Sequence, residues 1–320
     1  MLSCAVLDDY QDVAQSIADW RPLEGKVRVQ SFNEHFFDRA ALAQALSGFE
    51  IVVAMRERTP FDAWLFERLP NLKLLVTTGM RNASTDLEAA ARHGVQVCGT
   101  NSSAGATAEL AWALIHALVR DIPGEVDRFR HGGKWQAGLG RDLLGKTLGV
   151  IGMGNLGARV ARVGLAFGMR VSGWSRSLTP ERCTEIGIRH AGTLDHLLAD
   201  SDIVSLHVTL NAQSRGLIGA REFGLMRRNA YLVNTSRGPV VDEAALIHAL
   251  RTEQIAGAGV DVYAEEPLPL DHPFRSLDGL IATPHLGYVT EDTYRIYYGH
   301  AVENISAWVA GKPVRLLGTS

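Results

Sequence analysis

Three residues whose types suit catalysis follow three successive apolar strand candidates in the second half of the chain. Arg237 follows "YLVN", Glu266 follows "GAGVDV" and His285 follows "GLIAT". Ligands of open parallel sheets bind outside the carboxyl ends of the strands, so we expect these side chains at one edge. An arginine there can hold a carboxylate, and a histidine beside a carboxylate can be kept protonated as a general acid. Together they suit reduction of a 2-keto acid by hydride transfer, although each alone could be an ordinary loop residue.

A glycine-rich turn opens this second series of strands. The sequence Gly152-Met-Gly154-Asn-Leu-Gly157 follows the apolar run "LGVI" and precedes a helical pattern. Gly152 permits a tight turn, Gly154 lets the backbone approach a pyrophosphate, and Gly157 allows close packing of helix against strand. The alternative is a glycine-rich turn without a ligand. The strand before it, the helix after it and the further strand–helix units favour a dinucleotide site.

The residues after the next strand bear on the choice of dinucleotide. Units that bind NAD usually place an Asp or Glu about 20 residues beyond the glycines, where it holds the ribose hydroxyls. Here that position reads Trp174-Ser175-Arg176. Ser175 can hydrogen-bond a ribose oxygen, and Arg176 can pair with a 2′-phosphate that an acid would repel. We therefore expect NADP to be favoured, with NAD possible. The alternative is that Arg176 is an exposed loop charge.

Short apolar runs alternate with helical periodicity along the whole chain, which predicts an α/β fold with parallel sheets. The strands are predicted at 2–7, 27–31, 51–54, 72–76, 95–98, 147–151, 169–174, 202–208, 231–234, 257–262 and 280–283. The helices are predicted near 11–18, 38–46, 61–68, 86–92, 104–120, 155–167, 194–199, 221–227 and 242–251, with a last one from about 291. Asp242 is expected to cap the helix that follows it.

Composition places the chain among ordinary globular proteins. Its 320 residues are 46% hydrophobic and 21% charged, and the net charge of −3 gives no reason to expect a nucleic acid or membrane partner. Cys4, Cys98 and Cys183 have neither metal-ligand nor disulfide spacing, so we expect no metal and a reducing compartment. The start resembles no signal peptide, and the longest apolar window (110–119) is too short to span a bilayer. We expect a cytoplasmic protein.

With these motifs together, the chain resembles the D-isomer-specific 2-hydroxyacid dehydrogenase family, which includes glyoxylate/hydroxypyruvate reductases and D-3-phosphoglycerate dehydrogenases. The resemblance rests on "LPNLKLLVTTG", "RDLLGKTLGVIGMGNLG", "AFGMRV", "VNTSRGPVVDEAAL", "GAGVDVYAEEP" and "TPHLG". It implies two doubly wound domains, with a Rossmann cofactor domain inserted in a flavodoxin-like substrate domain. We expect the substrate domain at 1–101 plus 286–320 and the NAD(P)-binding domain at 102–285. It also implies a homodimer.

The resemblance implies roles for the residues that match the family motifs. Arg237 would bind the substrate carboxylate, His285 would be the acid–base residue, and Glu266 would tune it. The residues implied to contact the cofactor, besides the glycines, are Asn155, Leu156, Thr235, Ser236, Asp261 and Gly287. Asp261 stands at a strand end, where it could bind a carboxamide.

The expected substrate loop departs from the family pattern. Backbone N–H groups of a Gly-Val-Gly-like turn usually receive the substrate carboxylate, and here the turn reads Thr78-Gly79-Met80-Arg81. We expect Thr78, Gly79 and Met80 to bind substrate. Because the second glycine is missing, the larger side chains could narrow the pocket or add a charge.

Two other functions remain open from the sequence. One is a dinucleotide-sensing binding protein, such as the transcriptional corepressors that share this fold, and some of those retain the Arg–Glu–His set. The other is oxidation of formate, which Glu266 disfavours because formate enzymes of this fold pair the histidine with Gln. The reading that accounts for most of the motifs is an NAD(P)-dependent reductase of a small 2-keto acid of the glyoxylate or hydroxypyruvate type, giving the D-2-hydroxy acid.

Overall fold

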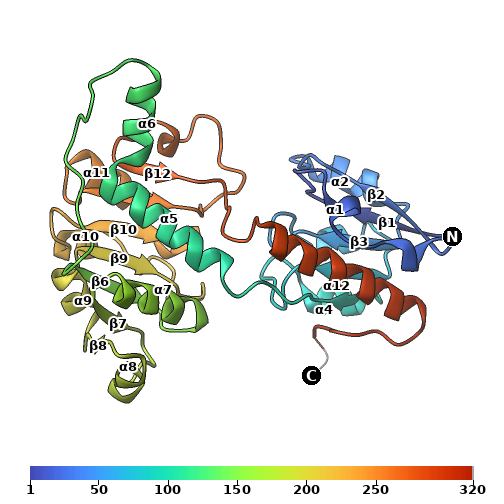
Figure 1. Cartoon of the computed structure of the whole chain (residues 1–320). Helices are drawn as coiled ribbons and strands as arrows, with labels where there is room; N and C mark the ends of the chain where they lie inside the picture. The colour runs from blue at the N-terminus through green and yellow to red at the C-terminus, as the bar shows by residue number, and fades with distance from the viewer. Residues whose placement is uncertain (319–320) are drawn as a thin grey trace. The chain divides into compact units, whose positions relative to one another are not determined.

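The computed structural model describes residues 1–318, and they form two compact units (Figure 1). Unit 1 comprises residues 1–103 together with the chain from 290 onward, and unit 2 comprises residues 104–289. Unit 2 is thus inserted in unit 1 in the sequence. Both units are built from parallel strands with helices between them, which confirms the α/β class and the two doubly wound sheets.

Unit 1 contains a five-stranded sheet in the order β2-β1-β3-β4-β5. The strands are β1 (Leu2–Val6), β2 (Val27–Ser31), β3 (Ile51–Ala54), β4 (Leu74–Thr77) and β5 (Gln96–Cys98). The helices are α1 (Ala14–Ile17), α2 (Arg39–Leu46), α3 (Ala63–Phe66), α4 (Leu87–Arg92) and, from the end of the chain, α12 (Glu291–Val309). β3 and β4 are buried along their whole length, as expected for strands covered on both faces.

Unit 2 contains a seven-stranded sheet in the order β12-β11-β10-β9-β6-β7-β8, and all the recorded pairs are parallel. The strands are β6 (Thr147–Ile151), β7 (Arg170–Trp174), β8 (Arg189–His190), β9 (Ile203–Leu206), β10 (Tyr231–Asn234), β11 (Gly257–Val260) and β12 (Leu280–Ala282). The order reverses between β6 and β9. This is the switch point at which doubly wound sheets bind their ligands.

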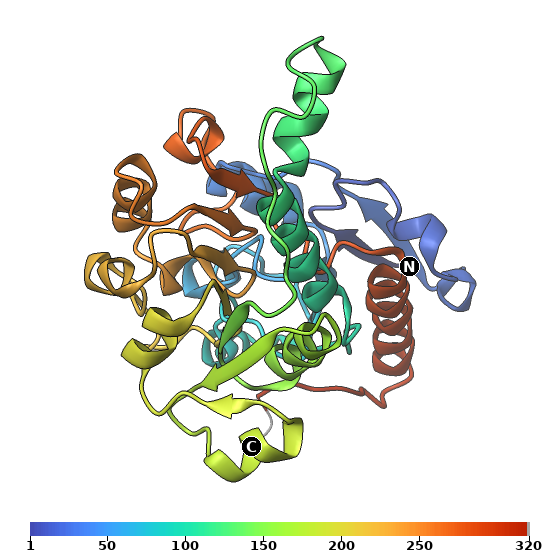
Figure 2. The same cartoon turned by 60° about the vertical axis from the view of Figure 1, so that its left-hand side comes forward.

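Helices cover both faces of the unit 2 sheet (Figures 1 and 2). The helices are α5 (Ala106–Arg120), α6 (Ile122–Arg130), α7 (Asn155–Ala166), α8 (Pro180–Ile186), α9 (Leu194–Asp200), α10 (Ala220–Leu225) and α11 (Glu243–Arg251). Apolar side chains of α5 and α7 pack on one face of the sheet. Those of α9, α10 and α11 pack on the other. Asp242 caps α11 by accepting a hydrogen bond from the Ala245 N–H, as predicted.

Two helices and one short strand were not expected from the sequence. α6 contains Pro123 and Gly124, which read as helix breakers, yet proline is tolerated in a first helical turn because its missing N–H has no partner there. Asp121, with a φ of 46°, separates α6 from α5. α8 and β8 lie in a polar stretch without clear periodicity.

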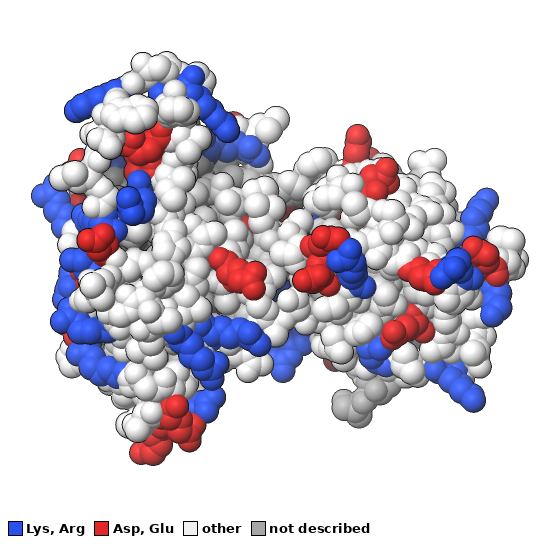
Figure 3. Space-filling view, in the orientation of Figure 1, with Lys and Arg blue, Asp and Glu red and all other residues white. Residues whose placement is uncertain are grey.

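The described residues contain no helix that is long and apolar enough to cross a membrane. The side chains of Cys4, Cys98 and Cys183 are buried and form no disulfide. Acidic and basic side chains both occur on each unit in the face shown in Figure 3.

Candidate active site

The turn between β6 and α7 combines two crowded glycines with one that faces open space. Gly152 has a φ of 95°, and a Cβ at Gly157 would lie 1.9 Å from the Gly152 carbonyl oxygen, so both positions require glycine. A Cβ at Gly154 would meet nothing within 4 Å. Gly154 precedes Asn155 at the start of α7, and no side chain caps this helix. The first-turn N–H groups therefore face a space that suits a phosphate group.

The loop after β10 carries Arg237 in a turn that is held by side-chain hydrogen bonds. The buried Asn234 side chain accepts from the N–H and the hydroxyl of Ser236, and donates to the Arg237 carbonyl oxygen at 3.0 Å. A Cβ at Gly238 would overlap the backbone of Tyr263, so the turn packs directly against the next strand-end loop. The Arg237 guanidinium is half-buried and donates to the Ser236 carbonyl oxygen at 2.8 Å.

The Thr235 hydroxyl in the same loop is buried, and among the described residues it has no hydrogen-bond partner. A buried hydroxyl without a partner is costly in a folded protein. It is therefore a candidate contact for a bound ligand.

His285 and Glu266 form a direct pair at the ends of β12 and β11. The His285 Nδ1 lies 2.5 Å from the Glu266 Oε2, and both side chains are partly exposed. The Glu266 Oε1 accepts from the Tyr263 N–H at 3.0 Å, which fixes the carboxylate. The ring of Tyr288 stands edge-on to the imidazole, with centroids 5.1 Å apart. With Nδ1 held by Glu266, Nε2 is the nitrogen left to exchange a proton with a substrate.

Asp261 supports the loop that carries His285. Its carboxylate accepts from the Thr283 hydroxyl at 2.6 Å and from the N–H groups of Leu286 at 2.7 Å and Gly287 at 2.8 Å. Burial raises the pKa of Asp261 despite these hydrogen bonds. This structural role was not anticipated from the sequence, and contact of Asp261 with the cofactor stays a prediction.

Ser175 and Arg176 follow β7, as the sequence indicated. Ser175 is half-buried, and its carbonyl oxygen accepts from the Leu178 N–H, which closes a turn. The exposed Arg176 side chain reaches the loop after β9, where it donates to Gln213. Asn155 and Leu156 open α7, next to Gly154.

His207, directly after β9, lies at the carboxyl edge of the same sheet and is a candidate site residue that the sequence prediction missed. Its Nε2 lies 2.9 Å from the Ser205 hydroxyl, while its buried Nδ1 has no hydrogen-bond partner among the described residues. Burial lowers the pKa of His207 to about 4, so its imidazole is neutral at pH 7. The prediction read residues 202–208 as one strand, which hid a polar residue at the strand end.

The expected substrate loop lies in unit 1 after β4, and part of its hydrogen bonding is internal. The Thr78 N–H donates to the Ala54 carbonyl oxygen at 3.1 Å, and the Gly79 N–H donates to the Thr100 hydroxyl at 2.8 Å. Within the described chain, the N–H groups of Met80 and Arg81 have no acceptor. These two groups are therefore better placed to receive a carboxylate than those of Thr78 and Gly79.

Arg56 also contacts this loop and was missed. It follows β3 with a φ of 52°, its N–H donates to the Thr78 hydroxyl at 2.8 Å, and its guanidinium reaches the Thr78 carbonyl oxygen. A Cβ at Gly79 would lie 2.1 Å from the Arg56 Nη1, so the glycine makes room for the guanidinium. The available signal was an arginine two residues after a buried strand.

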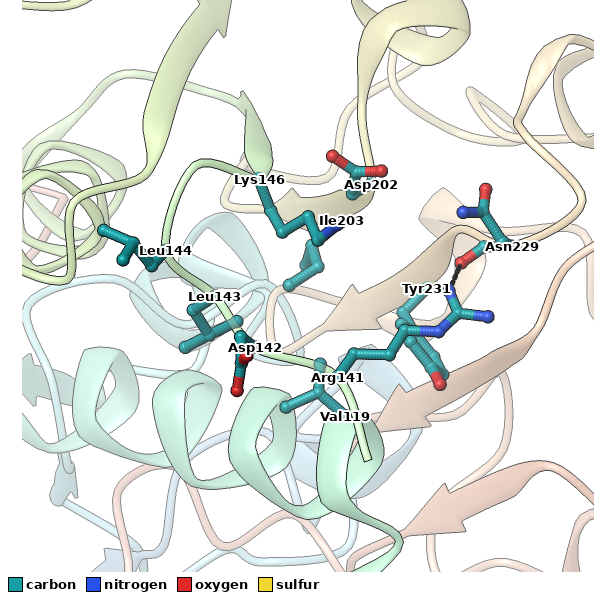
Figure 4. A pocket seen from close by; sticks show the side chains of 10 residues that line it. All are labelled: Val119, Arg141, Asp142, Leu143, Leu144, Lys146, Asp202, Ile203, Asn229 and Tyr231. Atoms are coloured by element: carbon teal, nitrogen blue, oxygen red, sulfur yellow. Dashed lines mark hydrogen bonds between the residues drawn. The ribbon is translucent and has the colours of Figure 1, made fainter. Parts of the chain in front are cut away.

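A cavity of about 410 Å³ lies at the opposite edge of the unit 2 sheet, next to the starts of β6, β9 and β10 (Figure 4). Arg141 donates to the Asn229 carbonyl oxygen there and lies over the ring of Tyr231. Asp202 accepts from the Thr147 N–H at 2.8 Å. This cavity contains none of the predicted site residues, and parallel sheets bind ligands at the other edge.

Unit 2 thus brings the glycine turn, Thr235, Arg237 and the His285–Glu266 pair to the carboxyl edge of one sheet. The open space at Gly154, the uncapped α7 and the Thr235 hydroxyl fit a dinucleotide. Fold and site together define an α/β dehydrogenase of the nicotinamide-dinucleotide-binding class.

Comparison with known proteins identifies the family. The model of the D-isomer specific 2-hydroxyacid dehydrogenase NAD binding domain matches residues 112–287. A glyoxylate reductase from Aeropyrum pernix is 40% identical over 261 residues, covering 78% of this chain and 77% of that protein. A D-3-phosphoglycerate dehydrogenase from Archaeoglobus fulgidus is 36% identical, covering 87% of this chain but only 53% of that protein. The crystal structure of a phosphoglycerate oxidoreductase from Vibrio cholerae superposes with a TM-score of 0.91 at 37% identity, covering 97% of this chain and all of the other.

The chain belongs to the D-isomer specific 2-hydroxyacid dehydrogenase family. It is an enzyme that acts on the CH–OH group of a 2-hydroxy acid, or on the corresponding 2-keto acid in the reverse direction.

Proposed function

We propose that the enzyme reduces a small 2-keto acid, glyoxylate or hydroxypyruvate, to the D-2-hydroxy acid with NADPH. The observation that carries this proposal is the contact of His285 with Glu266 at the edge of the sheet that holds the glycine turn, with Arg237 following a neighbouring strand at that edge. Unit 2 binds the cofactor in this proposal, and unit 1 supplies the substrate loop Thr78–Met80.

In the proposed reaction, Arg237, His285 and Glu266 of unit 2 have three different roles. Arg237 binds the substrate carboxylate and draws electron density from the neighbouring carbonyl. A nicotinamide cofactor bound at the glycine turn would supply the hydride that the carbonyl carbon accepts. His285 donates the proton on Nε2 to the carbonyl oxygen, which completes the hydroxyl group. Glu266 holds Nδ1 at 2.5 Å and stabilises the positive charge that the imidazole carries before this transfer. Glu266 also supports the keto-acid reaction over formate oxidation.

A relative supports the choice of a glyoxylate-type substrate, since the glyoxylate reductase from Aeropyrum pernix is 40% identical to this chain over 261 residues. In unit 1, the half-exposed Met80 and the Arg56 guanidinium occupy the surroundings of Gly79. Such side chains suit a short anionic substrate.

The choice of NADPH rests on Ser175 and Arg176, which stand after β7 where NAD-binding units carry an acid. The Arg176 side chain is exposed at the carboxyl edge of the sheet, so a phosphate could reach it. The buried, unpaired cysteines are in keeping with work in the cytoplasm.

A homodimer is also part of the proposal, and its support is an apolar surface on unit 2. α6 has no buried residue, and Phe129 and Trp135 are 72% and 75% exposed. Ile122, Val126 and Leu139 are exposed in the same segment. A surface of this kind usually marks a protein interface. Sedimentation equilibrium of the full chain should give twice the chain mass, and a monomer at micromolar concentration would contradict the assignment.

The central test is a panel of initial rates with glyoxylate, hydroxypyruvate, pyruvate and phosphohydroxypyruvate, each with NADH and NADPH. We expect the first two substrates with NADPH to give the highest kcat/KM. A large preference for NADH would overturn the role of Arg176. Tight dinucleotide binding without turnover of any substrate would instead favour a corepressor-like binding protein.

A further inference from the structure

Two loops of unit 2 meet through a single side chain at the carboxyl edge of the sheet. The loop after β7 carries Arg176, and the loop after β9 carries Gln213. The Arg176 Nη1 donates to the Gln213 Oε1 at 3.1 Å, and the Nη2 donates to the Gln213 carbonyl oxygen. Gln213, which is 37 positions away in the chain, thus accepts hydrogen bonds from both terminal nitrogens of the Arg176 guanidinium.

The loop that carries Gln213 is itself braced by hydrogen bonds. The Asn211 side-chain oxygen accepts from the N–H groups of Gln213 at 2.9 Å and Ser214 at 3.0 Å. The hydroxyl of the buried Ser214 accepts from the Asn211 N–H and donates to the Thr209 carbonyl oxygen at 2.7 Å. Gln213 therefore offers its two oxygens to Arg176 from a defined position.

The pairing leaves the guanidinium able to bind a second group. A guanidinium has five N–H donors in one plane, and Gln213 engages two of them. The N–H on Nε and one on each terminal nitrogen are not used by Gln213. Because an amide oxygen is neutral, it fixes the plane without cancelling the positive charge. A carboxylate at this position would pair with Arg176 and repel an incoming phosphate.

We propose that Gln213 is a positioning residue for cofactor choice, which orients Arg176 toward a phosphate on the 2′-oxygen of the adenosine ribose. This inference rests on the proposed preference for NADPH. It adds that the preference depends on the loop after β9 as well as on the loop after β7.

Calorimetric titration of the full-length enzyme with 2′,5′-ADP and with 5′-AMP tests the proposal, because only the first probe carries the 2′-phosphate. We expect R176A to weaken 2′,5′-ADP binding about tenfold or more, since it removes a charge-assisted hydrogen bond. Q213A should weaken it roughly threefold to tenfold, and Q213E more than Q213A. Binding of 5′-AMP should change less than twofold in every variant.

A double-mutant cycle separates orientation of Arg176 from a general effect on the loop. In the R176A background, the Q213A substitution should have no further effect on 2′,5′-ADP binding. R182A is the matched control, because Arg182 is an exposed arginine six positions further on that pairs with Glu185. It removes the same charge and should leave both titrations unchanged.

The outcomes distinguish this inference from the proposed function. If R176A weakens 2′,5′-ADP binding but Q213A leaves it unchanged or strengthens it, Arg176 selects the cofactor without Gln213 and the inference is wrong. The inference is also wrong if Q213A weakens 2′,5′-ADP binding by the same factor in the R176A background as in the wild type. If the wild type binds both probes equally and R176A changes neither, the preference for NADPH fails, and the inference fails with it.

Discussion

The carboxyl edges of the two sheets differ in how their polar groups are satisfied. In unit 2, the Thr235 hydroxyl and the His207 Nδ1 are buried without partners in the described chain, and the space beside Gly154 is open. In unit 1, more of the edge is satisfied internally: the Gly79 N–H donates to Thr100, and the buried Asp8 carboxylate pairs with His35. Only the N–H groups of Met80 and Arg81 in the described part of the substrate loop lack an acceptor. The same architecture therefore gives one edge where buried polar side chains are left for a ligand, and one edge where a short loop leaves backbone N–H groups.

The largest expected effect comes from removing the acid–base residue of unit 2. H285A should lower kcat by roughly 10²- to 10⁴-fold, the usual contribution of a general acid, while dinucleotide binding changes little. E266Q should lower kcat less, because the imidazole keeps a polar neighbour at Nδ1 but loses its negative partner. Steady-state rates and calorimetric binding measure the two effects. Full activity of H285A would mean that the edge of unit 2 only binds ligands.

Two glycines of the same turn allow a sharper test of the open space at that edge. G154V places a side chain where nothing lies within 4 Å, so the fold should persist while dinucleotide affinity falls about tenfold or more. G157A is the matched control, because its methyl group would collide with the Gly152 carbonyl oxygen at 1.9 Å. It should lower the free energy of unfolding by roughly 1–3 kcal/mol. Thermal melts measure the stability of both variants, and titrations with dinucleotide measure their affinity. An equal loss of stability in G154V and G157A would contradict the open space at Gly154.

The smallest expected effect concerns the edge of unit 1. R56L should raise the KM for the keto acid severalfold, up to about tenfold, because the guanidinium that lies on the Thr78–Gly79 loop is a nearby positive charge for an anionic substrate. The KM for NADPH should not change. R28L, at an exposed position of β2, serves as the control for loss of a charge. An unchanged KM for the keto acid in R56L would mean that Arg56 only shapes the loop.

Much of this arrangement could be predicted because parallel strands have a simple sequence pattern. Buried strands such as Tyr231–Asn234 and Gly257–Val260 are apolar, and the polar residues after them necessarily reach one edge. That logic predicted the fold class and located Glu266 and His285, whose contact the structure shows. Applied to the first series of strands as well, it would have identified Arg56.

Other features depend on contacts that local patterns do not contain. Asp261 holds residues 25 and 26 positions away, and Arg176 meets Gln213 only because β7 and β9 flank β6 in the sheet. His207 was hidden because a polar residue at a strand end reads as a continuation of the strand. α6 was missed because Pro123 and Gly124 act as breakers in most positions but not in a first helical turn.

The insertion of unit 2 within unit 1 also determines the order in which the enzyme can fold during synthesis. α12 buries Tyr294, Tyr297 and Tyr298 in unit 1 and packs against α1 and β4, yet it begins only at Glu291, after the whole of unit 2. The Thr107 hydroxyl, near the start of unit 2, donates to the Gly287 carbonyl oxygen near its end, so the two ends of the insertion are joined just before the chain returns to unit 1. The first-made sheet therefore waits for the last-made helix to complete its core, and until then the apolar side chains that α12 covers are exposed to aggregation.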